Sequence, residues 1–74
     1  MGRLIRLDRT GHTTLAEWSA EEAESHEAAV AAFRRELDAG MLASVPSAVG
    51  TAEVVRELPV DAELVVLRRP IAGG

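Results

Sequence analysis

The sequence predicts a single α+β domain in which one helix packs across a small sheet. Three observations carry this prediction: an alternating apolar and charged segment at residues 3–8, a helical stripe of apolar residues in the middle of the chain, and an apolar run at residues 64–67. The 74-residue chain has room for only one such domain. A domain of this size buries only about 60% of the surface of its unfolded chain, so we expect a small core.

The amino-terminal segment predicts a β-hairpin. Ile5 and Leu7 alternate with charged residues, which is the period-two pattern of a strand. Gly11 lies where a short loop at residues 9–12 needs a left-handed backbone. Residues 13–18 then resume with β-forming side chains.

The middle of the chain predicts one helix. Ser19 begins the sequence Ser-Ala-Glu-Glu, a capping-box pattern that indicates a helix start. Val30, Phe33 and Leu37 lie three and four residues apart and form one apolar stripe. Gly40 supplies the stop.

Further strands are expected after this helix. Residues 41–45 form a short apolar run that ends at Pro46. Residues 52–58 place apolar residues among charges and predict a half-exposed strand closed by Pro59. Residues 64–67 are apolar on both faces, which indicates a central strand. A loop and a turn are expected at residues 47–50 and 60–63.

The predicted order of elements is strand, strand, helix, strand, strand, strand. If the first and last strands pair, they pair in parallel with the helix inside the crossover, because parallel neighbours need a long connection. This order is the β-grasp arrangement, ββαβ(β)β, with one helix packed across a mixed sheet. We expect the domain to span residues 1–69 and a tail to span residues 70–74.

The chain resembles ubiquitin and its bacterial relatives in three segments. Residues 7–17 look like the first hairpin of ubiquitin, with a Thr-Gly turn followed by a cation, a Thr and a Leu; His12 occupies the position of that cation. The helical stripe has the spacing of the ubiquitin helix, and residues 63–69 are similar to its last strand and Arg-containing tail. Residues 61–74 are also similar to the tails of the small sulfur carriers of molybdopterin and thiamine synthesis, which finish on Gly-Gly.

In both families the resemblance implies one chemistry. An adenylating partner, similar to the ubiquitin-activating enzymes, activates the terminal carboxylate with ATP, and the acyl adenylate then becomes a thiocarboxylate or passes to an amine of a target protein. Gly74 would carry this carboxylate, and Gly73 is slim enough to thread a narrow cleft because it has no side chain. Arg68 and Arg69 either steer the tail into an acidic channel by Coulomb attraction or are solvated residues at a strand end.

The chain also departs from ubiquitin. It contains no lysine, so it cannot be linked into polymers of itself through lysine side chains. Residues 19–27 are longer and more acidic than the corresponding link of ubiquitin, and the sequence shows no counterpart of ubiquitin's apolar recognition patch. Sulfur carriage and single attachment remain. Two alternatives stay open: a non-conjugated β-grasp interaction module that binds by adding a strand to a sheet edge, and a small structural subunit of an assembly.

Composition argues against several other classes of function. The net charge of −4 and the pI near 5.0 oppose nucleic-acid binding, which neutralises many phosphates with cations. Cysteine is absent, so no disulfide, thiolate zinc site or thiol nucleophile is available. His12 and His26 are the only imidazoles, too few with no thiolate to complete a zinc site, and we expect neither a metal nor a cofactor.

No catalytic or membrane motif stands out either. The chain has no Gly-x-Ser-x-Gly nucleophile motif and no Gly-rich loop with lysine, so we do not expect it to be an enzyme. It also has no apolar run of a membrane-spanning length, and its first residues are too charged for a signal peptide. These features predict a cytoplasmic protein without membrane contacts.

Overall fold

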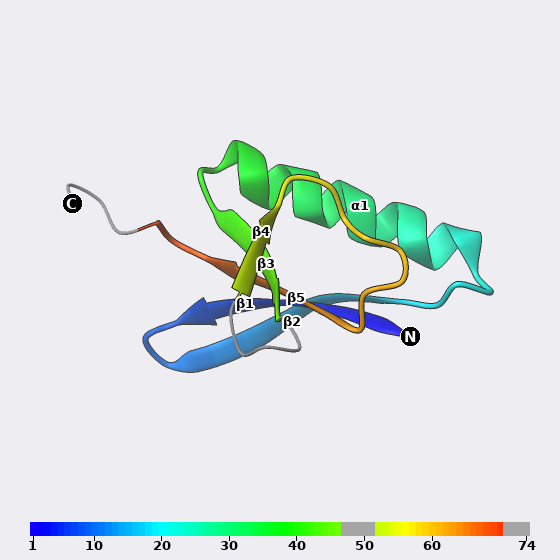
Figure 1. Cartoon of the computed structure of the whole chain (residues 1–74), viewed down its shortest axis with the longest axis horizontal. Coiled ribbons are helices and arrows are strands. Elements are labelled where there is room, and N and C mark those ends of the chain that lie inside the picture. Colours follow the sequence, from blue (N-terminus) through cyan, green and yellow to red (C-terminus); the bar gives the residue numbers. More distant parts are fainter. Residues whose placement is uncertain (47–51, 71–74) are drawn as a thin grey trace.

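The computed structural model describes residues 1–46 and 52–70. Within these residues it has an α+β architecture, in which one helix lies across one face of a five-stranded mixed sheet (Figure 1). The elements are β1 (Gly2–Asp8), β2 (Gly11–Trp18), α1 (Ala23–Asp38), β3 (Leu42–Pro46), β4 (Ala52–Val55) and β5 (Leu64–Arg68).

The first and last strands are neighbours at the centre of the sheet. The strand order is β2-β1-β5-β3-β4. β1 and β5 are parallel, with Leu4 opposite Val65 and Arg6 opposite Leu67, whereas the other pairs of neighbours are antiparallel. The predicted parallel pairing is therefore confirmed, and so is the prediction that the apolar run before Arg68 forms a central strand.

The hairpin forms as predicted, and β2 begins two residues earlier than expected. Gly11 has a φ of 126°, the left-handed backbone that the turn requires. A β-bulge interrupts the pairing where Leu4 is opposite Ala16 and the next residue of β1, Ile5, is opposite Thr14. The extra residue on β2 is Leu15, and both Leu15 and Ala16 pack against the core.

The predicted capping box at Ser19 is wrong. The helix begins at Ala23, and its N-cap residue, Glu22, makes no side-chain hydrogen bond to the helix. Ser19 instead extends the end of β2 and forms an isolated bridge with Glu22. The Ser25 hydroxyl donates to the Glu22 carbonyl at 2.7 Å and accepts from the Ser19 N–H at 3.0 Å. Ser19 does not cap the helix, because its hydroxyl accepts from the Glu21 N–H at 3.2 Å and the helix begins only at Ala23.

The helix ends where the sequence predicts. Gly40 has a φ of 96°, its N–H donates to the Leu37 carbonyl at 2.9 Å, and the Met41 N–H donates to the Glu36 carbonyl at 3.0 Å. These two bonds are the Schellman motif, which satisfies carbonyls that have no partner inside the helix. The backbone turns at Gly40 directly into β3.

The core lies between α1 and one face of the sheet. Its buried members are Leu4, Trp18, Ala29, Phe33, Ala43, Val65 and Leu67. The predicted stripe holds for Phe33, which is buried, and for Leu37, which packs against the core. Val30 is only half-buried and is not part of this cluster; Ala29, one residue earlier, is buried in its place.

Trp18 is buried beside the start of the helix. Its indole N–H donates to the Val60 carbonyl at 3.1 Å, which ties the turn before β5 to the end of β2. Its ring meets that of His26 edge to face, with 6.4 Å between the ring centroids. One aromatic side chain thus joins three segments of the chain.

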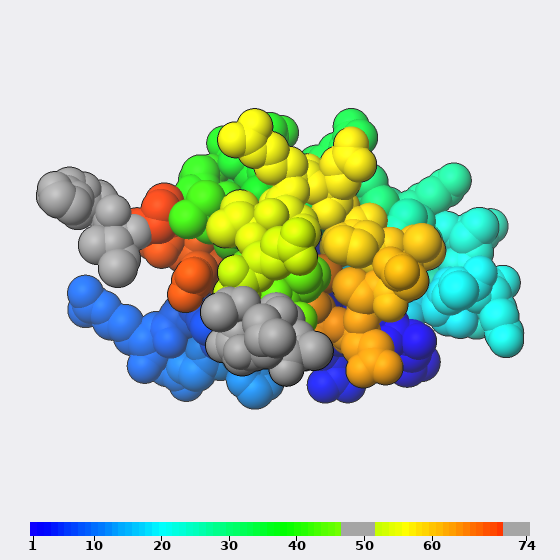
Figure 2. All heavy atoms as spheres, viewed as in Figure 1, coloured from blue at the N-terminus to red at the C-terminus, as the bar shows by residue number. Residues whose placement is uncertain are grey.

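β4 is shorter than predicted, because it ends at Val55 rather than at Leu58. The chain bends at residues 56–57, and Leu58 turns back against the core. In Figure 2 the segment from β4 to β5, yellow to orange, fills the surface between β4 and the start of the helix. The turn at residues 60–61 is confirmed. The expected loop at residues 47–50 lies outside the described residues.

No helix in the described part of the chain is long and apolar enough to cross a membrane.

Candidate functional site

The carboxyl end of β5 carries the first two of the predicted site residues. Arg68 is the last residue of the strand, opposite Leu42 of β3, and Arg69 follows it directly. Both side chains are exposed. Gly73 and Gly74, the predicted carrier residues, lie outside the described residues.

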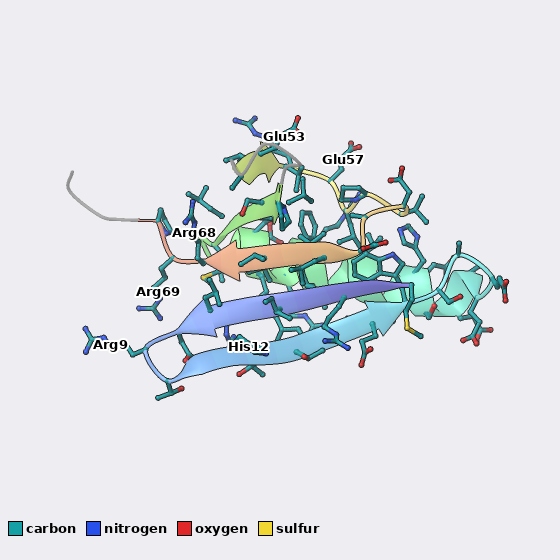
Figure 3. The ribbon with its side chains drawn as sticks, turned by 60° about the horizontal axis from the view of Figure 1, so that its bottom comes forward. Arg9, His12, Glu53, Glu57, Arg68 and Arg69 are labelled. Atoms are coloured by element: carbon teal, nitrogen blue, oxygen red, sulfur yellow. The ribbon has the colours of Figure 1, made fainter. Side chains whose placement is uncertain are left out.

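An open groove separates this end of β5 from the hairpin turn and the end of α1. We call it the turn groove. Its charged lining residues are Arg6, Asp8, Arg9, Glu36, Arg68 and Arg69. Leu7 and Met41 contribute apolar surface to it. Figure 3 shows Arg9, Arg68 and Arg69 at the same end of the molecule, where the hairpin turn and the end of β5 come together.

The carboxylates of the groove are already engaged by neighbours. Glu36 on the helix accepts a hydrogen bond from Arg6 of β1 at 3.1 Å and forms an ion pair with it. Asp8 accepts from the backbone N–H of Thr10 at 2.8 Å and from the Thr10 hydroxyl at 2.7 Å. These two bonds from Thr10, the hydroxyl bond foremost, hold the pKa of Asp8 below its ordinary value of 3.8. Asp8 therefore stays ionised and keeps the turn closed around Gly11.

The face of the sheet that α1 does not cover carries a row of three apolar residues and one serine. Ile5 pairs with Val66, Val66 with Ser44, and Ser44 with Val54, so these four side chains lie side by side across β1, β5, β3 and β4. We call them the open-face row. Ile5 and Ser44 are buried between their neighbours on adjacent strands, whereas Val54 is 59% exposed.

Polar and apolar side chains surround the open-face row. Leu7 and Leu42 lie on the same face and are 44% and 41% exposed. Arg3 and Glu17 form an ion pair across β1 and β2 at 3.5 Å on this face. The face is thus apolar at its centre and charged at its margin, which is the usual anatomy of a protein-binding surface.

The described residues hold no group of three or more His, Asp or Glu side chains placed to bind a metal ion. His12 is exposed at the start of β2 and His26 lies on the helix beside Trp18, on different elements. The His26 Nε2 atom is buried and has no hydrogen-bond partner among the described residues. His26 as a whole is half-buried, and its ring packs edge to face against the Trp18 ring.

Comparisons with protein-family models, with curated proteins and with solved structures found no match.

Sequence reasoning named Arg68 and Arg69 as candidate site residues and did not name the other residues that line the turn groove with them. Arg9 reaches the turn groove only because β1 pairs in parallel with β5, which brings the hairpin turn beside the end of the last strand. The open-face row also went unpredicted. Its members come from four strands, and each of them lies next to a core-facing residue on its own strand, but no single segment shows that the four are neighbours.

Proposed function

We propose that this chain is a β-grasp, ubiquitin-like carrier whose Gly74 carboxylate is adenylated by a partner enzyme. The adenylated end then either receives sulfur as a thiocarboxylate or is attached to an amine of a target protein. The chain supplies the acyl group and the docking surface, and the partner supplies the catalysis.

The observation that carries this proposal is the strand order β2-β1-β5-β3-β4 with the single helix between β2 and β3. This strand order is compatible with the β-grasp arrangement that we propose, because the first and last strands are parallel neighbours with the helix in the connection between them. It anchors β5 by hydrogen bonds on both sides, to β1 and to β3. Arg69 therefore directly follows a central strand that is held on both sides, which would give the proposed tail a fixed starting point.

The carrier itself has to supply only a reactive carboxylate to this chemistry. A carboxylate oxygen attacks the α-phosphorus of ATP, pyrophosphate leaves, and the mixed anhydride is then open to a sulfur donor or an amine, with AMP as the leaving group. A glycine at the reacting end has no side chain to collide with the walls of a narrow channel. The need for ATP fits the cytoplasmic location that the sequence predicts.

Two surfaces of the described residues support a partner of this kind. The turn groove places exposed arginines next to the root of the tail. The open-face row and its exposed neighbours Leu7 and Leu42 provide an apolar area that a partner could cover. The open-face row lies on strands of the sheet, and the turn groove is framed by the ends of β1, β5 and α1, so the backbone of both surfaces is preorganised for binding.

Intact-mass spectrometry tests the proposal. The purified full chain is first weighed to establish that Gly74 bears the free carboxylate, and it is then incubated with ATP and lysate of the cells that encode it. We expect either the mass gain of one oxygen replaced by sulfur or new, larger protein bands. A variant lacking Gly74 should show neither, whereas Arg56→Gln, an exposed change outside both surfaces, should behave as the native chain.

An unchanged mass under these conditions would overturn the carrier function and favour an interaction module that is never conjugated. The open edges of the sheet favour this second candidate. β2 is an eight-residue edge strand whose first four residues are exposed, so a partner strand could pair with it. A small structural subunit of an assembly would share this result and would be recovered as a stable complex.

A further inference from the structure

The turn groove is a strongly charged feature of the described surface that the proposed tail chemistry does not itself use. Four arginines line it, against two carboxylates. This excess of positive charge occurs on a chain whose net charge is −4. The overall composition of this acidic chain therefore does not account for the excess of positive charge in the turn groove.

The arginines of the groove divide into two kinds. Arg6 is committed to Glu36 by a part-buried ion pair at 3.1 Å. Arg9, Arg68 and Arg69 are exposed. Within residues 1–46 and 52–70, none of the three forms an ion pair. Asp8, the remaining carboxylate, accepts its hydrogen bonds from Thr10. Three guanidinium groups are thus left facing solvent along the described part of one groove.

The fold fixes the backbone positions of these three arginines. The parallel register that sets Arg6 opposite Leu67 also sets the end of β1 beside the end of β5. The left-handed backbone of Gly11 and the Asp8 hydrogen bonds close the turn that carries Arg9. A partner therefore meets a preformed group of cations, and only the side chains have to be ordered on binding.

We propose that Arg9, Arg68 and Arg69 form one docking surface for a carboxylate-rich surface of the partner protein. A guanidinium group binds a carboxylate through two parallel hydrogen bonds, a geometry that an ammonium group cannot match. Leu7 and Met41 in the same groove add apolar contact, which suits a protein surface. Nucleic acid is disfavoured because its binding requires many neutralised phosphates and the rest of this chain is acidic.

This inference deepens the proposed carrier function and rests on it for the identity of the partner. It adds Arg9 to the two arginines at the end of β5 and excludes Arg6, which Glu36 already holds. Contact at the hairpin turn would fix the orientation of the carrier as well as attract it. The tail would then leave the body in one direction relative to the partner.

The test uses an octaglutamate peptide as the probe and the 15N-labelled full chain, followed by NMR at low ionic strength. We expect the largest amide shifts at the hairpin turn and at the end of β5. Arg9→Gln and Arg69→Gln should each weaken binding about two- to fivefold, as expected for exposed ion pairs. Arg34→Gln and Arg56→Gln, which remove exposed arginines elsewhere, should leave the affinity unchanged. Added salt should weaken binding through screening.

Several outcomes would overturn the inference. Absence of binding at low salt would do so, as would equal losses in the Arg9→Gln and Arg56→Gln variants. Tighter binding of an oligonucleotide of equal charge would replace the carboxylate partner with a phosphate ligand. The titration contains neither ATP nor enzyme, so a chain that binds octaglutamate through the groove but is never adenylated would separate failure of the carrier function from failure of this surface.

Discussion

The two faces of the sheet are built from alternate residues of the same strands, yet they differ sharply in burial. On β1, Leu4 faces the helix and is fully buried, whereas Leu7 faces away and is 44% exposed. On β3 and β4, Ala43 and Val55 pack toward the core, whereas Leu42 and Val54 lie on the open face. Both faces are apolar at their centre, and only one of them has a helix to cover it.

This difference separates apolar residues that stabilise the fold from those that remain available for binding. Burial against α1 removes a side chain from water in the isolated chain, and this contributes directly to folding. The exposed residues of the open face, Leu7, Leu42 and Val54, gain comparable burial only when a partner covers them. Substitutions on the covered face should therefore lower the stability of the fold, whereas substitutions on the open face should weaken the binding of a partner.

The largest expected effect comes from truncating the centre of the covered face. Phe33→Ala should lower the free energy of unfolding by about 3–5 kcal/mol, since it opens a cavity under the helix. Val54→Ala on the open face should change it by less than about 0.5 kcal/mol. Urea denaturation of both variants measures the contrast, and similar losses would show that the two faces are not distinct.

Adding a methyl group to the covered face should also destabilise the fold. A Cβ on Gly2 would collide with the Cε2 and Cζ2 atoms of the buried Trp18 ring. Gly2→Ala should therefore cost about 1–3 kcal/mol by overpacking. Met1→Ala, next to it on an exposed residue, is the matched control. A native melting temperature for Gly2→Ala would mean that the indole ring can move aside freely.

Ile5 sharpens the comparison because it is buried while lying on the open face. Thr14 and Val66 flank it on the neighbouring strands and exclude water from it. Ile5→Val should lower the free energy of unfolding by about 0.5–1.5 kcal/mol, whereas Leu7→Val on the same face should be nearly neutral. If both changes are neutral in denaturation, lateral packing on this face does not contribute to stability.

The two ion pairs offer a smaller contrast, since one lies on each face. Arg6–Glu36 joins the sheet to the helix at 3.1 Å and is partly buried, while Arg3–Glu17 is exposed at 3.5 Å. A double-mutant cycle with Gln substitutions should give a coupling energy of about 0.3–1 kcal/mol for Arg6–Glu36 and less for Arg3–Glu17. Equal couplings, or a coupling that does not decrease with salt, would contradict this assignment.

The hairpin turn belongs to neither face of the sheet, and the stability that it contributes should depend on pH. Hydrogen bonds from Thr10 lower the pKa of Asp8 in the folded state. Their contribution to the stability of the fold is therefore complete when the pH is above the ordinary pKa of 3.8, and it is lost as the pH falls through the lowered pKa. Asp8→Asn should remove this dependence. Titration of the Asp8 carboxyl by NMR measures it, and a pKa at or above the ordinary value would contradict the role of Thr10.

Local chemistry made much of the fold predictable. Gly11 and Gly40 both adopt the left-handed backbone that their positions suggested, because few other residues tolerate it. The apolar run before Arg68 identified a central strand, since only a strand flanked by partners can be apolar throughout. The helix start predicted at Ser19 was wrong, because a capping pattern describes only a local preference and Ser19 instead forms a bridge with Glu22.

The sequence by itself determined the order of elements, the two backbone turns and the pair of arginines at the end of β5, because each depends on neighbouring residues. The tertiary structure decided where Arg9 lies and which apolar residues remain uncovered. The parallel pairing of β1 with β5 brings residues from opposite ends of the chain to one groove. A single helix can cover only one face of the sheet, and no pattern within one strand indicates which face that helix will cover.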